Sequence, residues 1–136
     1  MIVNNYLNLI KNINFKYLRL MSSRPEQKKL RNYLLNYKAN KCLICGVIYP
    51  PYILECAHIK PRKISNKIER NDFNIVKLMC RNCHKLYDYG DIGVLDTLIY
   101  KNEIIDDIEL LESIDLDEYK LSEGYFEYHF KNIYKK

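Results

Sequence analysis

The sequence predicts an α+β fold in which two strands and a short helix are stapled by cysteines and flanked by helices at both ends. Two Cys-x-x-Cys pairs mark the ends of this unit, Cys42 with Cys45 and Cys80 with Cys83. Short apolar and β-branched runs lie between the pairs, and apolar residues recur at helical spacing before and after them. Together these observations predict a mixed fold built around a metal site.

Length and composition favour one domain of 136 residues, with N-terminal helices over 1–41, a core over 42–100 and an acidic helical segment over 101–136. No apolar run is long enough for a membrane span, and residues 1–10 lack the basic start of a secretory signal. We therefore expect no membrane partner and an intracellular location, in the cytoplasm or the nucleoid or nucleus. In such a reducing compartment paired cysteines act as metal ligands rather than disulfides.

Two helices are expected before the first cysteine pair. Residues 5–20 carry apolar side chains at three- and four-residue spacing. Ser23 and Glu26 fit a capping box that starts a second helix, with Pro25 in its first turn. This helix is expected to run to about Tyr37, with inward-facing residues Leu30, Leu34 and Tyr37.

Strands at 52–59 and 73–79, separated by a basic loop over 62–71, are predicted between the cysteine pairs. A short helix over 83–89 follows, and Gly90 ends it. Residues 91–100 resemble one or two edge strands, and one or two helices are expected after residue 104. This order places His58 at the end of the first strand and His84 in the first turn of the helix.

Four thiols in two Cys-x-x-Cys pairs suit a closed tetrahedral zinc site. Such a site has no need of the two nearby histidines. His58 could take a proton from water, and His84, whose backbone is fixed beside a zinc ligand, could hold a second cation. The fifth cysteine, Cys56, is expected to be a buried free thiol in the first strand.

The charge is uneven along the chain. Residues 101–136 carry ten acidic and five basic residues, whereas residues 1–100 carry seven acidic and 17 basic ones. A basic region of this size favours a polyanion such as DNA or RNA, although a solvated lysine-rich surface gives the same composition.

The motifs between Arg24 and Gly90 match a known pattern. An Arg/Gln-rich helix is followed by a Cys-x-x-Cys pair, by Ala57-His58-Ile59-Lys60-Pro61, by a strand led by Asn74, and by His84 with Tyr87-Asp88-Tyr89-Gly90. In this order they resemble the HNH endonucleases, and more narrowly the restriction-type modules, over residues 24–100. The resemblance implies the ββα-metal fold and hydrolysis of DNA phosphodiester bonds.

The resemblance also implies roles for particular residues. His58 would be the general base, Asn74 the middle residue of the motif, and His84 the ligand of a catalytic Mg²⁺ or Mn²⁺ ion. Asn71 is an alternative to Asn74. The residue before the base, which binds the cation in many HNH enzymes, is Ala57 here.

Three further polar residues receive less specific expectations. Glu55 is interpreted as structural because a strand would place it on the face opposite to His58. Asp88 is interpreted as a residue that orients a ligand or ends the helix, and His129 as a packed or surface residue of a helix.

Several basic residues are candidate phosphate contacts, namely Arg24, Lys28, Arg31, Lys60, Arg62, Lys63 and Arg81. One ββα unit has one active site, so cutting both strands would need a homodimer or two binding events. A second interpretation remains open: a zinc module without catalysis that binds nucleic acid or protein, for which His58 would be unnecessary.

Overall fold

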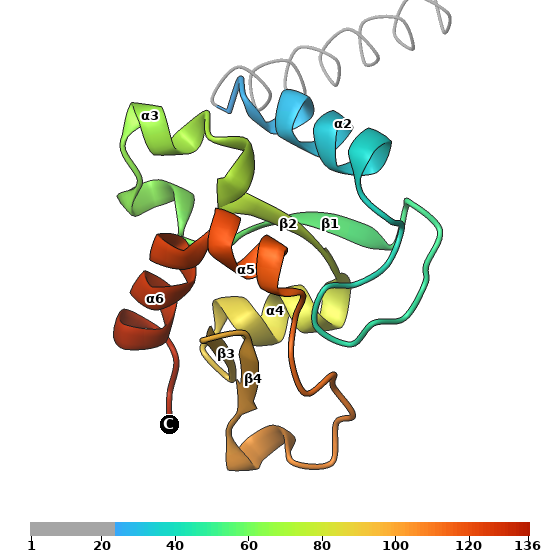
Figure 1. Cartoon of the computed structure of the whole chain (residues 1–136), viewed down its shortest axis with the longest axis vertical. Helices are drawn as coiled ribbons and strands as arrows, with labels where there is room; N and C mark the ends of the chain where they lie inside the picture. Colours follow the sequence, from blue (N-terminus) through green and yellow to red (C-terminus); the bar gives the residue numbers. More distant parts are fainter. Residues whose placement is uncertain (1–23) are drawn as a thin grey trace, which may run out of the picture.

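The computed structural model describes residues 24–136 (Figure 1). The helix predicted over 5–20 and the predicted cap Ser23 lie outside the described residues. The element order over the rest is α2, β1, α3, β2, α4, β3, β4, α5 and α6, with three short 3-10 turns between them. The predicted α+β fold with a β-hairpin followed by a helix is confirmed.

Helix α2 (Gln27–Tyr37) buries Leu30 and Leu34, as predicted. Two details of the prediction were wrong. Tyr37 is 74% exposed. Its ring lies at the surface of the last turn, where it packs on Tyr33 of the same helix, with 5.3 Å between the ring centroids. Glu26 is the N-cap residue of the helix and does not lie in its first turn, and its buried carboxylate accepts a 2.5 Å hydrogen bond from Arg62 Nε.

Strands β1 (Leu54–His58) and β2 (Val76–Cys80) form an antiparallel hairpin in which Leu54 faces Cys80 and His58 faces Val76. The connection between them is not the irregular loop that the polar composition predicted. It contains a 3-10 turn (Arg62–Ile64), the one-turn helix α3 (Lys67–Arg70) and a second 3-10 turn (Phe73–Ile75). A capping box between Asn66 and Glu69 supplies the local hydrogen bonds that stabilise α3.

Helix α4 (Arg81–Asp88) follows β2 directly and packs on the hairpin, which completes the ββα unit. Gly90, at a φ of +86°, ends it as predicted, and a Cβ at this position would lie 2.3 Å from the Ile133 carbonyl oxygen. A second hairpin follows, with strands β3 (Ile92–Leu95) and β4 (Leu98–Lys101).

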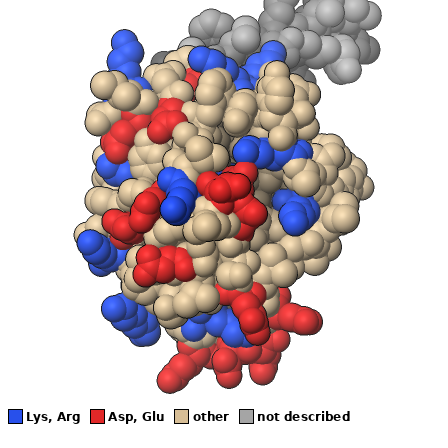
Figure 2. Space-filling view, viewed as in Figure 1, with Lys and Arg blue, Asp and Glu red and all other residues tan. Residues whose placement is uncertain are grey.

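The C-terminal segment contains a 3-10 turn (Glu103–Ile105) and the helices α5 (Leu116–Leu121) and α6 (Glu123–Asn132). Figure 2 shows acidic side chains gathered at the end of the molecule where the chain runs on from β4. Helix α6 packs on β3, and His129 is buried in this contact. The His129 ring stacks on the Tyr87 ring at 3.6 Å, and His129 Nε2 lies 2.7 Å from the Tyr87 carbonyl oxygen.

This packing fixes the helix of the ββα unit from both sides. The Tyr87 hydroxyl donates a 2.9 Å hydrogen bond to the Ile59 carbonyl, one residue after His58. Tyr87 is fully buried and therefore holds α4 against the end of β1. Within residues 24–136 no helix is long and apolar enough to span a membrane.

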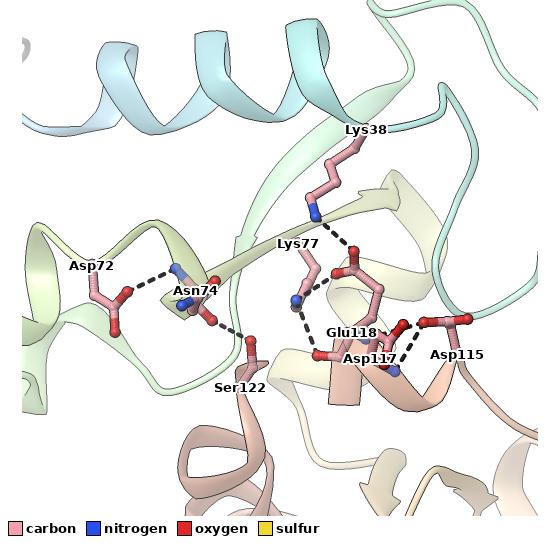
Figure 3. A network of polar contacts seen from close by, with 8 residues as sticks. All are labelled: Lys38, Asp72, Asn74, Lys77, Asp115, Asp117, Glu118 and Ser122. Atoms are coloured by element: carbon pink, nitrogen blue, oxygen red, sulfur yellow. Dashed lines mark hydrogen bonds and ion pairs between the residues drawn. The ribbon is translucent and has the colours of Figure 1, made fainter. Parts of the chain in front are cut away.

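An ion-pair network joins the acidic segment to the ββα unit (Figure 3). The Glu118 carboxylate on α5 accepts hydrogen bonds of 2.6 Å from Lys77 on β2 and 2.6 Å from Lys38 after α2. Lys77 is 3% exposed, and burial lowers its pKa although Glu118 opposes that change. Burial raises the pKa of Glu118, but hydrogen bonds from the two lysines outweigh it, so the pKa is lowered. The attraction between the two groups thus favours the charged form of each, against the effect of burial.

Replacing Glu118 by alanine is expected to destabilise the fold by about 3 kcal/mol, because it leaves the Lys77 ammonium buried without its counter-ion. The matched control is Lys38→Met, which removes the more exposed partner of the same carboxylate and is expected to cost less than about 1 kcal/mol. Urea unfolding at saturating zinc measures both free energies. Equal losses in the two variants would show that burial of Lys77 does not decide the stability of this network.

Candidate active site and metal centre

The four paired cysteines converge as predicted. Cys42 and Cys45 lie in the turn before β1, where Gly46 adopts a φ of +74°. Cys80 ends β2 and Cys83 lies in the first turn of α4. Their Sγ atoms all lie within 4.8 Å of one another, and an ideal zinc tetrahedron places sulfurs about 3.8 Å apart. The donor set and its spacing fit zinc, so the cluster suggests a zinc site.

The four thiols influence one another's ionisation. Burial raises the pKa of Cys45 to about 11, and the hydrogen bond to Cys42 together with burial raises the pKa of Cys83. A hydrogen bond from Cys83 lowers the pKa of Cys42 to about 5. Zinc binds cysteine as the thiolate, so a bound zinc ion would have to replace the protons of these thiols.

A cavity of about 390 Å³ lies beside this unit, at the free edge of β1. Alternation along β1 directs Cys56 and His58 to one face and Glu55 and Ala57 to the other. Because β1 pairs only with β2 within residues 24–136, its other edge is not covered by a strand of this part of the chain, and the cavity extends past this edge to α4. Residues from α2, β1, the following connection and α4 line it, namely Arg24, Gln27, Cys56, His58, Pro61, Arg62, Lys63, His84 and Asp88.

His58 ends β1, as predicted, and its Nε2 atom is buried without a hydrogen-bond partner within the described chain. Burial lowers the pKa of His58 to about 4, and the nearby Arg24 guanidinium adds to the effect. The imidazole is therefore neutral at physiological pH. A buried, unpartnered nitrogen that faces a cavity can accept a proton from a water molecule bound there.

His84 lies between two carboxylates. Its Nδ1 atom is 2.8 Å from Glu55 Oε1, and its Nε2 atom is 3.1 Å from Asp88 Oδ2. The hydrogen bond to Asp88 raises the pKa of His84 despite the opposing effect of burial, and Glu55 contributes in the same direction. One imidazole and two carboxylates form a donor set that suits a divalent cation such as Mg²⁺ or Mn²⁺, if one carboxylate gives up its contact with the ring.

Glu55 was not predicted to belong to this cluster, because strand alternation separates it from His58. Its contact with His84 crosses from β1 to α4, and no sequence spacing reveals such a contact. The contact between His84 and Asp88 is local in sequence, because residues four apart lie on the same face of a helix.

The two asparagines considered for the middle of the motif lie elsewhere. Asn74 lies in the 3-10 turn before β2, where its N–H donates to the Asp72 carboxylate and its carbonyl accepts from the Ser122 hydroxyl (Figure 3). Asn71 is exposed and its side chain donates to the Lys67 carbonyl. Neither residue lines the cavity that contains His58 and His84.

Comparison with known families addresses the ββα unit. Residues 42–95 match the family model described as HNH endonuclease, and these residues contain both cysteine pairs, His58 and His84. This segment belongs to the HNH endonuclease family. The HNH endonucleases are phosphodiester hydrolases, so membership implies nuclease activity and a nucleic-acid substrate. A search of curated proteins found no match to the chain.

The candidate phosphate contacts fall into two groups. Arg24, Arg62 and Lys63 line the cavity, where Arg62 also pairs with Glu26, and Lys28 is exposed on α2, one turn after Arg24. The side chains in the second group make contacts within the fold. Arg31 donates to the Leu54 and Pro51 carbonyls, Lys60 pairs with Glu69 at 2.9 Å, and Arg81 lies 3.5 Å from Glu55.

Proposed function

We propose that this protein is a metal-dependent endonuclease that hydrolyses DNA phosphodiester bonds, with His58 as the general base and His84 as a ligand of the catalytic Mg²⁺ or Mn²⁺ ion. The observation that carries the proposal is the shared cavity, which is lined by His58, whose Nε2 atom is buried without a partner, and by the carboxylate-flanked His84. A binding module without catalysis would not need the two histidines to line one cavity.

In the proposed reaction a water oxygen bonds to the phosphorus while the bond between phosphorus and the 3′ oxygen breaks. One water proton passes to His58 Nε2, and the leaving oxygen takes a proton from solvent. One of the two carboxylates, Glu55 or Asp88, keeps its contact and holds the His84 ring in a fixed orientation, as carboxylates commonly do for metal-binding histidines, while the other ring nitrogen is left for the cation. A bound divalent cation would supply charge stabilisation for the leaving oxygen.

The substrate is held by the cationic side chains of the cavity. Arg24 and Lys63 are exposed at its rim, and their charges suit the phosphates on either side of the scissile bond. Exposed Lys28 extends this basic surface along α2. Arg31, Lys60 and Arg81 would contribute to DNA binding only by releasing contacts within the fold.

Plasmid nicking with Mg²⁺ or Mn²⁺ tests the proposal. The zinc-loaded protein is expected to convert supercoiled DNA to nicked and then linear DNA, and to do nothing without an added divalent cation. His84→Ala is expected to slow nicking by at least about 100-fold, because both the cation ligand and the residue that fixes the carboxylates are lost.

The control for this variant is Asn82→Ala, an exposed position in the same helical turn, which is expected to nick at the parent rate. A folded, zinc-loaded protein that cuts DNA with neither cation would overturn the proposal. Cleavage of RNA but not DNA would contradict the proposed substrate but would still support the proposed nuclease chemistry.

A further inference from the structure

The helix that precedes the HNH segment contributes a polar side chain to the catalytic cavity. Gln27 is the first residue of α2 and lines the same cavity as His58. Its Oε1 atom is buried and has no hydrogen-bond partner within residues 24–136, and the same holds for His58 Nε2. The two side chains that carry these unpartnered atoms therefore line one cavity, and one of them belongs to the proposed base.

An unpartnered buried acceptor lowers the free energy of unfolding by about 1–3 kcal/mol. Two such acceptors in one place are therefore tolerated more readily when they bind a common ligand. The ligand that the proposed reaction itself requires is a water molecule, which would satisfy both acceptors once a small shift of the side chains opens these atoms to the cavity.

We propose that Gln27 accepts a hydrogen bond from the attacking water while His58 accepts the proton that this water loses. The inference rests on the proposed nuclease function and assigns a further catalytic residue outside residues 42–95. A water molecule with one acceptor rotates freely, whereas two acceptors fix both of its protons and direct an oxygen lone pair at the phosphorus. Such orientation lowers the activation free energy without changing the affinity for DNA.

The test compares two substitutions of nearly equal size. Gln27→Met removes the acceptor, and Gln27→Glu retains an oxygen at the same distance along the side chain. Gln27→Met is expected to lower kcat for plasmid nicking by about 10- to 100-fold with KM for DNA unchanged, as loss of one hydrogen bond to a reacting group implies. Gln27→Glu is expected to stay within about fivefold of the parent kcat.

Thermal unfolding provides the second measurement. A structural Gln27 would make Gln27→Met less stable, whereas an unpartnered acceptor predicts a Tm equal to or above that of the parent protein. Asn36→Met, at an exposed position on α2, is the control for helix substitution and is expected to change neither kcat nor Tm.

The outcomes separate this inference from the proposed function. A parent protein that does not cut DNA overturns both. If the parent is active and Gln27→Met is equally active, only the role of Gln27 is overturned. The same holds if Gln27→Met loses kcat together with Tm, or if Gln27→Glu loses as much kcat as Gln27→Met.

Discussion

The Cys42→Ser variant is expected to be largely unfolded and to bind less than one zinc ion per chain. Cys42 is fully buried, and its Sγ atom belongs to the cluster that joins the turn before β1 to the end of β2 and the start of α4. Structural zinc contributes about 10 kcal/mol or more to small domains, which is as large as the whole stability of a typical domain. Loss of one ligand therefore removes most of the folding free energy. Far-UV circular dichroism and the zinc content of the purified protein measure the result.

Cys56→Ala is the matched control for this substitution. Cys56 is also a buried cysteine of the ββα unit, but it lies in β1 outside the cluster, and burial raises its pKa to about 12. This variant is expected to retain one zinc ion per chain and a cooperative melt, with a loss of about 1 kcal/mol from the smaller side chain. A Cys42→Ser protein that melts like Cys56→Ala and holds a full equivalent of zinc would show that the cluster is not what stabilises the unit.

Features encoded by spacing could be predicted from the sequence. Two Cys-x-x-Cys pairs can reach one tetrahedral ion from two tight turns, so their convergence follows from geometry alone. The positions of His58 at a strand end and His84 in a first helical turn follow from the same local patterns. Helix α3 was not predicted, because its capping box lies within a segment whose polar composition is also typical of loops.

Contacts between distant elements could not be predicted in this way. Glu55 contacts His84 from β1, and Gln27 lines the cavity of His58 from a helix that precedes the first cysteine. Similarly, Glu118 pairs with Lys77 across 41 residues of sequence. Each contact depends on how the helices pack against the hairpin, and neither strand nor helix periodicity encodes that packing. The candidate site is therefore richer in carboxylate and amide groups than its motif indicates.

The His58→Ala variant is expected to lower kcat for DNA nicking by about 10²- to 10⁴-fold, the usual contribution of a general base. His58 faces a cavity of about 390 Å³, which leaves room for a small base in place of the lost ring. Imidazole added to the His58→Ala protein is therefore expected to restore part of the rate in proportion to its neutral form, whereas it should not change the rate of His84→Ala. A His58→Ala protein that cuts as well as the parent would refute the assignment of the base.

The pH dependence of the parent protein gives an independent measurement of the same group. Burial lowers the pKa of His58 to about 4, and Arg24 lowers it further than burial alone would. A base must be unprotonated to accept a proton, so His58 stays competent until the pH approaches 4. At a concentration of divalent cation that keeps His84 unprotonated, we therefore expect kcat/KM to hold between about pH 8 and 5.5 and to fall below that range, rather than near 6.5 where an exposed histidine titrates.

Replacing Arg24 by glutamine tests the cause of this shift. It removes a positive charge beside the imidazole, so the pKa of His58 is expected to rise and the acidic limb of the profile to move to higher pH. Circular dichroism and zinc content at each pH distinguish titration of His58 from acid unfolding. At saturating divalent cation, with fold and zinc intact, an acidic limb near 6.5 in the parent protein would show that His58 is solvated when it acts or that another group accepts the proton.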